Sequence, residues 1–256
     1  MPAESTDQFR RRVLGGETLF GLFLDLSSPA SAELSGRAGY DWLLVDLEHG
    51  AGTEADLPAM LMAVESSGAA AMVRTQSGER IRIGRALDQG ATGIMIPRMQ
   101  SAAEVAEAVT YLRYPPTGMR GVALRTRGAG LGTVGHADVG QINDRIVGIV
   151  QIESVGALRE VDAIAATDGV DVLFVGPADL SHSLGVPGQF GSKLYLEALA
   201  TVVEACRAHG KSPGILLYDL ALVPRHLESG FRFMGIGADG ALVSAGAHAA
   251  IAAVRG

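Results

Sequence analysis

The sequence predicts an α/β protein in which residues 1–256 form a single domain, a closed TIM or (β/α)8 barrel. Eight short apolar runs typical of buried strands recur at even spacing, and a helical pattern follows each of them. No change of composition marks a linker, and 256 residues are enough for one large barrel. An open doubly wound sheet is the alternative fold, but eight evenly spaced units favour closure.

The elements follow one another in a regular order. An amphipathic pattern over residues 1–16, with Phe9 and Val13 on its apolar side, predicts a helix that caps the bottom of the barrel. The strands are expected at Leu19–Leu26, Trp42–Leu47, Ala70–Thr75, Gly93–Met99, Ile146–Ile152, Val170–Val175, Pro213–Tyr218 and Phe233–Ile236. The alanine-rich stretch Ala245–Val254 predicts a last helix that docks on another surface.

One segment, Tyr114 to Asn143, is too long for an ordinary connection between the fourth and fifth strands. A loop of this length in a compact barrel is usually functional or mobile. Two interpretations stay open, a flap over the site and a contact between copies of the chain. His182 and Tyr218 are further candidates for the entrance of the site, or else packed residues at the barrel top.

The composition excludes several classes of protein. A formal net charge of −7 with no basic face argues against a nucleic-acid or anionic-membrane partner. No apolar run approaches the roughly 20 residues of a membrane span, and the N-terminus lacks a signal-peptide pattern, so we expect a cytoplasmic protein. The single cysteine, Cys206, excludes an internal disulfide and a cysteine-based zinc site; it is expected to be a buried spectator.

Two consecutive strands are expected to end in carboxylates, Glu153 after one and Asp179 in the turn that follows the next. The carboxyl ends of parallel strands form the edge of a sheet where ligands bind. Two oxygen ligands on neighbouring strands suit Mg²⁺ or Mn²⁺, which complete their coordination with water and substrate. The alternative is that Glu153 caps the following helix and Asp179 lies in a first helical turn.

The second expected strand ends in Asp46, Leu47, Glu48 and His49. Alternation sends Asp46 and Glu48 to the same face, and His49 follows in the loop above them. A histidine with a carboxylate three residues earlier is suited to act as a general base. A histidine that merely caps the next turn is the alternative.

The third expected strand ends in Arg74, at the same edge. A buried guanidinium needs an anion or a carbonyl to meet, and its alternative role is an ion pair with Glu48 or Glu153. The turn at Gly176 offers the backbone N–H groups of Ala178 and Asp179 to a carboxylate or phosphate.

Lysine is nearly absent from the chain, which limits how a carbonyl group could be activated. The two lysines, Lys193 and Lys211, do not end an apolar strand, so a Schiff-base mechanism has no nucleophile. Carbonyl activation is therefore expected from a metal and Arg74.

Six segments in order, VDLEHG, MVRT, IPRMQSAAEV, RYPPTGMRG, VQIES and FVGPADLSHSLG, resemble the HpcH/HpaI family of metal-dependent class II pyruvate aldolases. The resemblance covers nearly the whole chain. It implies a TIM barrel of the phosphoenolpyruvate/pyruvate-binding type, assembled as a homohexamer whose last helix is exchanged between neighbours. It also implies a divalent cation, Mg²⁺, Mn²⁺ or Co²⁺, held by Glu153 and Asp179.

The resemblance further assigns a role to the residues that would hold pyruvate. Arg74 would polarise the pyruvate carbonyl, and Gln151 would help to hold the ligand. The amides of Ala178 and Asp179 would receive the pyruvate carboxylate.

Proton transfer and the neighbouring subunit are covered by the same resemblance. His49, paired with Asp46, would be the base acting through a metal-bound water, with Glu48 supporting the arrangement. Asp88 would reach the site of a neighbouring subunit. The chain departs from the family in the glycine-rich region 125–140, which leaves its role and the acceptor aldehyde open.

These observations favour a lyase that reversibly cleaves 4-hydroxy-2-oxo acids to pyruvate, or hydroxypyruvate, and an aldehyde. An oxaloacetate decarboxylase is the alternative, because loss of CO₂ produces the same enolate. A CoA-thioester lyase is disfavoured, since no added segment is available to hold CoA. A non-catalytic 2-oxo-acid-binding protein is the remaining alternative, although a binding site would not require the base His49.

Overall fold

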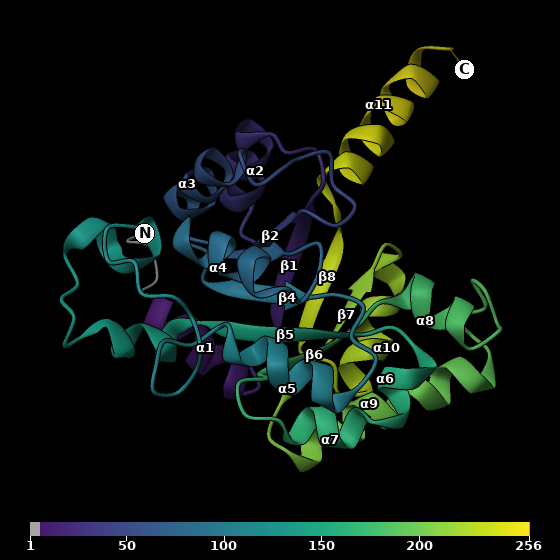
Figure 1. Cartoon of the computed structure of the whole chain (residues 1–256). Helices are drawn as coiled ribbons and strands as arrows, with labels where there is room; N and C mark the ends of the chain where they lie inside the picture. Colours follow the sequence, from purple (N-terminus) through teal and green to yellow (C-terminus); the bar gives the residue numbers. More distant parts are fainter. Residues whose placement is uncertain (1–5, 256) are drawn as a thin grey trace.

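The computed structural model describes residues 6–255 and contains eight parallel strands closed into a barrel (Figure 1). Each strand pairs with its neighbours in chain order, and β8 pairs back onto β1. The strands are β1 (Leu19–Leu24), β2 (Trp42–Asp46), β3 (Ala70–Arg74), β4 (Gly93–Ile96), β5 (Val147–Ile152), β6 (Val172–Val175), β7 (Ser212–Leu217) and β8 (Phe233–Ala238). The predicted closed barrel is confirmed, and the open sheet is excluded.

Helices and short 3-10 turns connect the strands and surround the barrel (Figure 1). They are α1 (Thr6–Leu14), α2 (Pro29–Arg37), α3 (Leu57–Ser67), α4 (Arg80–Asp88), α5 (Ala102–Thr110), η1 (Arg127–Gly132), η2 (Val139–Arg145), α6 (Val155–Arg159), α7 (Val161–Ala166), α8 (Pro177–Ser183), α9 (Lys193–Ala208), η3 (Leu220–Leu222), α10 (Val223–Glu228) and α11 (Asp239–Arg255). Serine hydroxyls accept an N–H of the first turn in α2, α5, α6 and α9, which fixes where these helices begin.

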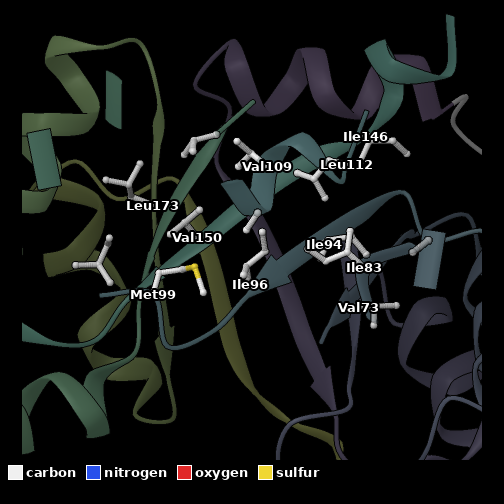
Figure 2. Packing of buried hydrophobic residues seen from close by; sticks show 14 of the residues in the cluster. Val73, Ile83, Ile94, Ile96, Met99, Val109, Leu112, Ile146, Val150 and Leu173 are labelled. Atoms are coloured by element: carbon white, nitrogen blue, oxygen red, sulfur yellow. The ribbon is translucent and has the colours of Figure 1, made fainter. Parts of the chain in front are cut away.

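Alternation along the strands divides the apolar residues into two layers. Inward residues fill the barrel with a small cluster in which Trp42 stacks on Phe233, with ring centroids 4.4 Å apart. Outward residues pack against the helices, as Figure 2 shows for Val73, Ile94 and Val150. The inward positions near the carboxyl ends of the strands remain for polar side chains.

Helix α1 closes the bottom of the barrel, as the sequence predicts. Phe9 and Val13 are buried in the cluster that fills the barrel, next to Leu19 at the start of β1. The helix is also tied by a bidentate contact in which Arg10 donates to both carboxylate oxygens of Asp171, at 2.9 and 2.8 Å. The first five residues of the predicted helix lie outside the described residues.

The two ends of the long segment from Tyr114 to Asn143 are joined by hydrogen bonds, and the segment packs at the bottom of the barrel. The Asn143 side chain accepts from the Tyr114 amide at 2.7 Å and donates to the Tyr114 carbonyl at 3.1 Å, which joins the two ends of the segment. Between these ends, η1 packs on α4, and η2 packs on α1. A cavity of about 570 Å³ lies between the segment, the first residues of β3 and the residues just before β4.

The location of this segment shows whether it forms a flap over the site. It lies at the end of the barrel opposite the expected site, so the segment, including its glycine-rich part, does not cover or line this chain's own entrance. A contact between copies of the chain stays a prediction for it.

Helix α11 leaves the barrel and extends away from it (yellow in Figure 1). Beyond its first residue its side chains are largely exposed, including Leu242, Val243, Ile251 and Val254. Such a row of exposed apolar residues on a helix indicates a surface that another surface covers. None of the described helices is long and apolar enough to cross a membrane.

Candidate active site

Polar side chains occupy the inward positions at the carboxyl ends of β2, β3 and β5. Asp46, Arg74, Gln151 and Glu153 each follow apolar inward residues on the same strand, and each is less than a tenth exposed. The strand pairing aligns Asp46 with Arg74 across β2 and β3. The four residues, predicted from three separate segments, therefore meet in one buried layer at the mouth of the barrel.

Arg74 and Asp46 form the centre of this layer. Arg74 donates from Nε to Oδ1 of Asp46 at 2.9 Å and from Nη2 to Oδ2 at 2.6 Å. Burial raises the pKa of Asp46, but the bonds from Arg74 outweigh it, so this pKa lies below its usual range. The guanidinium also lies over the Phe23 ring, 5.2 Å from its centroid. Its orientation is thus fixed before any ligand arrives.

The remaining guanidinium nitrogen of Arg74 points to two further mouth residues. Nη1 lies 3.2 Å from Oε2 of Glu48, although the two are not aligned for a hydrogen bond, and 3.5 Å from Oε1 of Gln151. The ion pair predicted as the alternative role of Arg74 is present with Glu48. Arg74 is less than a tenth exposed, so a ligand atom that reaches Nη1 would meet a guanidinium largely shielded from water.

The His49 ring lies above this layer and is held differently from the prediction. Asp46 accepts the backbone N–H of His49 at 3.3 Å, whereas the ring nitrogen Nε2 lies 3.8 Å from Oε1 of Glu48. The predicted pairing of the ring with Asp46 is therefore not found. Its cause is that both Asp46 oxygens already accept from Arg74. The side chain of His49 is 65% exposed and free to meet a substrate.

Glu153 is positioned by two hydrogen bonds at the end of β5. Its Oε1 accepts the amide of Arg98 at 2.6 Å, and its Oε2 accepts from Nε2 of Gln151 at 3.0 Å. Burial raises the pKa of Glu153 above its usual range, and the charges of Glu48 and Asp179 add to this effect. A buried carboxylate among other carboxylates is an environment that a cation would stabilise.

Asp179 lies in the first turn of α8, directly after β6, with Ala178 beside it. Its charge acts on Glu153, and both residues lie on the same side of the mouth. No group of three or more His, Cys, Asp or Glu side chains able to hold a metal occurs among residues 6–255. Two carboxylates alone fit a cation such as Mg²⁺, which keeps positions for water and substrate.

A glycine keeps this side of the mouth open. A Cβ on Gly176, between β6 and α8, would lie 2.7 Å from Oε2 of Glu153 and 3.3 Å from Nε2 of Gln151. Any other residue would push the carboxylate from its position. The donor set and the space around it therefore fit a hard divalent cation.

Asp88 is the one predicted site residue that the structure does not bring to the mouth. It lies at the end of α4, near the bottom of the barrel, and accepts from Nη2 of Arg120 at 3.1 Å. Within this chain it therefore helps to hold the long segment. Its predicted role toward a neighbouring subunit stays a prediction.

Sequence reasoning missed three contributors to the mouth. Arg98 was expected inside a strand, but β4 ends at Ile96, and Arg98, with a φ of 60°, donates its backbone N–H to Glu153. Asp25 and Asp239 form a carboxyl pair at the ends of β1 and β8. Asp25 could have been found by counting inward positions from Phe23, but β8 was expected to end before Asp239.

Comparison with known proteins identifies the family. Residues 19–245 match the model described as HpcH/HpaI aldolase/citrate lyase. The chain is 42% identical to a hydroxypyruvate/pyruvate aldolase of Paraburkholderia phytofirmans, over 91% of this chain and 92% of that protein. It is 38% identical to a 2-keto-3-deoxy-L-rhamnonate aldolase of Klebsiella pneumoniae, over 93% of this chain and 90% of that protein. A crystal structure of a family member from Burkholderia cenocepacia superposes with a TM-score of 0.92 at 36% identity, covering 98% of this chain and 100% of that one. The match extends over most of the barrel, and the chain therefore belongs to the HpcH/HpaI aldolase/citrate lyase family.

Proposed function

We propose that this enzyme is a metal-dependent aldolase that reversibly cleaves 4-hydroxy-2-oxo acids to pyruvate, or hydroxypyruvate, and an aldehyde. The observation that carries the proposal is the buried guanidinium of Arg74, fixed by Asp46 and surrounded by further carboxylates at an open barrel mouth. Relatives named as aldolases for oxo acids, at 38% to 42% identity, support the same reaction class.

Glu153 and Asp179 would hold the divalent cation, with Mg²⁺, Mn²⁺ and Co²⁺ as candidates. When bound, the cation acts as a Lewis acid that stabilises negative charge developing on the ketone oxygen of pyruvate. The first-turn amides of Ala178 and Asp179 have no acceptor within the helix, and they are suited to receive the pyruvate carboxylate. Gln151, fixed between Arg74 and Glu153, would orient the same ligand.

His49 is the proposed base. In the synthetic direction it removes a proton from the methyl carbon of pyruvate, and the resulting carbon nucleophile attacks the carbonyl carbon of the aldehyde. The proton held by His49 then passes to the aldehyde oxygen, so that the 4-hydroxyl group forms and the base is regenerated. Glu48, with Oε1 3.8 Å from the His49 ring, stabilises the positive charge that the ring acquires.

The assembly is part of the proposal. We infer a homohexamer of barrels, each a single domain of residues 1–256, in which α11 packs on a neighbouring copy. Exposed Leu242, Val243, Ile251 and Val254 on α11 support this arrangement, because they have no cover within their own barrel. Asp88 would face the mouth of a neighbour, and the proposed location is the cytoplasm. Light scattering of the whole chain, compared with a Leu242→Glu and Val243→Glu double variant, tests the assembly.

The activity test is pyruvate release from a panel of 4-hydroxy-2-oxo acids, with oxaloacetate included, after chelation and after return of each metal. We expect cleavage that is lost with the chelator and restored by at least one of the three cations. Consumption of oxaloacetate alone would favour the decarboxylase instead, because both reactions share the enolate and the same residues. No turnover with any metal would favour a 2-oxo-acid-binding protein.

A further inference from the structure

The inward side of β1 leads from the barrel interior to the rim of the mouth. Gly21 faces Trp42, and Phe23 lies under the Arg74 guanidinium. Asp25 is the next inward position, directly after β1, and it is only partly exposed. The sequence therefore gives the rim a carboxylate one step above the ring that supports Arg74.

Asp239 positions Asp25 and is itself buried away from any ligand. Its Oδ1 accepts the amides of Asp25 at 2.9 Å and Gly240 at 2.9 Å, and its Oδ2 accepts the Ser31 hydroxyl at 2.7 Å. Its side chain is 2% exposed. These bonds fix the backbone of Asp25 at the junction of β1 and β8.

Only one of the two carboxylate oxygens of Asp25 accepts a hydrogen bond from the described residues. Its Oδ1 accepts the Gly240 amide at 3.0 Å, while its Oδ2 accepts no N–H or O–H from the described residues. Burial, together with the adjacent Asp239 carboxyl, raises the pKa of Asp25 to about 6, so the group is mostly ionised at neutral pH. Oδ2 is therefore available as a hydrogen-bond acceptor.

Asp25 lies on the half of the mouth that the pyruvate residues leave open. Glu153, Asp179 and Gln151 come from β5 and the turn after β6, whereas Asp25 follows β1 on the other side of Arg74. Tyr218 directly follows β7, and the charges of Asp25, Arg74 and Asp46 all act on it, so it lies near them at this end of the barrel. An acceptor aldehyde must approach the reacting carbon of pyruvate from that open half.

We propose that Asp25, positioned by Asp239, is a specificity-determining residue that binds a hydroxyl group of the acceptor aldehyde through its free carboxylate oxygen. The enzyme accordingly prefers short hydroxylated aldehydes over apolar aldehydes of the same length. A hydroxyl group donates to this oxygen, whereas an alkyl chain would leave a partly desolvated carboxylate without a partner. This inference rests on the proposed aldolase activity.

The test measures kcat/KM for pyruvate addition to glyceraldehyde and to propanal, which has three carbons but no hydroxyl group. In Asp25→Ala we expect the ratio of the two values, glyceraldehyde over propanal, to fall by about 10- to 100-fold. Asp25→Asn keeps an acceptor oxygen and should retain most of this ratio. The Ala variant should fold, because the Gly240 amide keeps its bond to Asp239.

The outcomes separate the two proposals. Asp168, exposed at the bottom of the barrel, provides the control Asp168→Ala, in which the ratio should be unchanged. An unchanged ratio in Asp25→Ala, or an equal loss with both aldehydes, overturns the role of Asp25 alone. A wild-type enzyme that adds pyruvate to neither aldehyde overturns the aldolase proposal, and the role of Asp25 with it.

Discussion

The two ends of the barrel each hold a buried arginine–aspartate pair, but the surroundings of the two pairs are opposite in charge. At the bottom, Asp171 accepts from Arg10 at 2.9 and 2.8 Å and lies 3.7 Å from Arg113, so two guanidinium groups share one carboxylate. At the mouth, Arg74 is paired with Asp46 and approached by Glu48 at 3.2 Å.

Burial is the first cause of the main pKa shifts at both ends, and nearby like charges add to it. At the bottom, burial and the nearby charge of Arg10 lower the pKa of Arg113 to about 10, toward its neutral form. At the mouth, burial raises the pKa values of Glu48 and Glu153, also toward their neutral forms. The bottom is covered by α1 and serves stability, whereas the mouth is open and short of positive charge. That shortage is what a bound cation would remove.

The largest expected effect comes from the mouth. Glu153→Gln removes a charged oxygen from the proposed metal site, and we expect kcat/KM for a cleaved hydroxy-oxo acid to fall by about 10³-fold or more. Metal affinity, measured by calorimetry with Mn²⁺, should fall as well, while the melting temperature of the metal-free protein changes little. Full activity in this variant would show that Glu153 does not hold the metal.

The second effect concerns the proposed base. His49→Ala should lower kcat by about 10²- to 10³-fold, because proton transfer from the methyl group loses its acceptor. Binding of Mn²⁺ and of pyruvate should be retained, since the ring contacts neither Glu153 nor Asp179 in the proposed arrangement. His136→Ala, in the long segment at the opposite end, is the matched control. Turnover that survives in His49→Ala would contradict the assignment.

The bottom pair should show the reverse behaviour. Asp171→Asn leaves the Arg113 guanidinium and part of the Arg10 guanidinium without a counter-charge, and we expect a loss of about 3 kcal/mol in the free energy of unfolding. Turnover per folded molecule should be unchanged, because the mouth is untouched. The measurement is denaturant unfolding together with kcat normalised to folded protein. A variant of normal stability but low turnover would contradict the view that the bottom pair serves stability and the mouth serves catalysis.

The polar residues of the mouth could be predicted from the sequence, because they follow the pattern of the buried strands. Asp46, Arg74 and Glu153 were identified because each ends a clear apolar run, whereas the role of Gln151 came from the family resemblance. Most of the mouth layer is therefore predictable from a local sequence pattern, a polar residue at the end of an apolar run.

What the sequence did not predict depends on contacts between distant segments. The ring of His49 meets Glu48 because Arg74, from another strand, occupies Asp46. The long segment lies at the bottom because η2 packs on α1, about 130 residues earlier in the chain. Asp25 was overlooked because it was taken as part of an apolar strand, and its partner Asp239 lies beyond the expected end of β8.

The smallest expected effect is a pH dependence of stability that belongs to Asp25. Its pKa of about 6 in the folded protein exceeds the ordinary value of 3.8, so the folded state binds more protons than the unfolded state between these values. The contribution of Asp25 is therefore most favourable below about pH 4 and is lost as the pH rises through 6. Among the described residues, the titratable groups that act on it or feel its charge are Asp239 and Tyr218.

Asp25→Asn isolates that contribution, because the amide does not titrate. The melting temperature of the wild type, relative to that of the variant, should fall by about 2–4 °C between pH 4 and pH 7. The exposed control Asp168→Asn should follow the wild type at every pH. Parallel curves for wild type and Asp25→Asn would show that Asp25 is not strained by Asp239. A wild-type melting temperature that falls relative to that of the variant would show that the excess of carboxylates at the mouth extends to its rim. The bottom of the barrel, by contrast, has an excess of guanidinium groups.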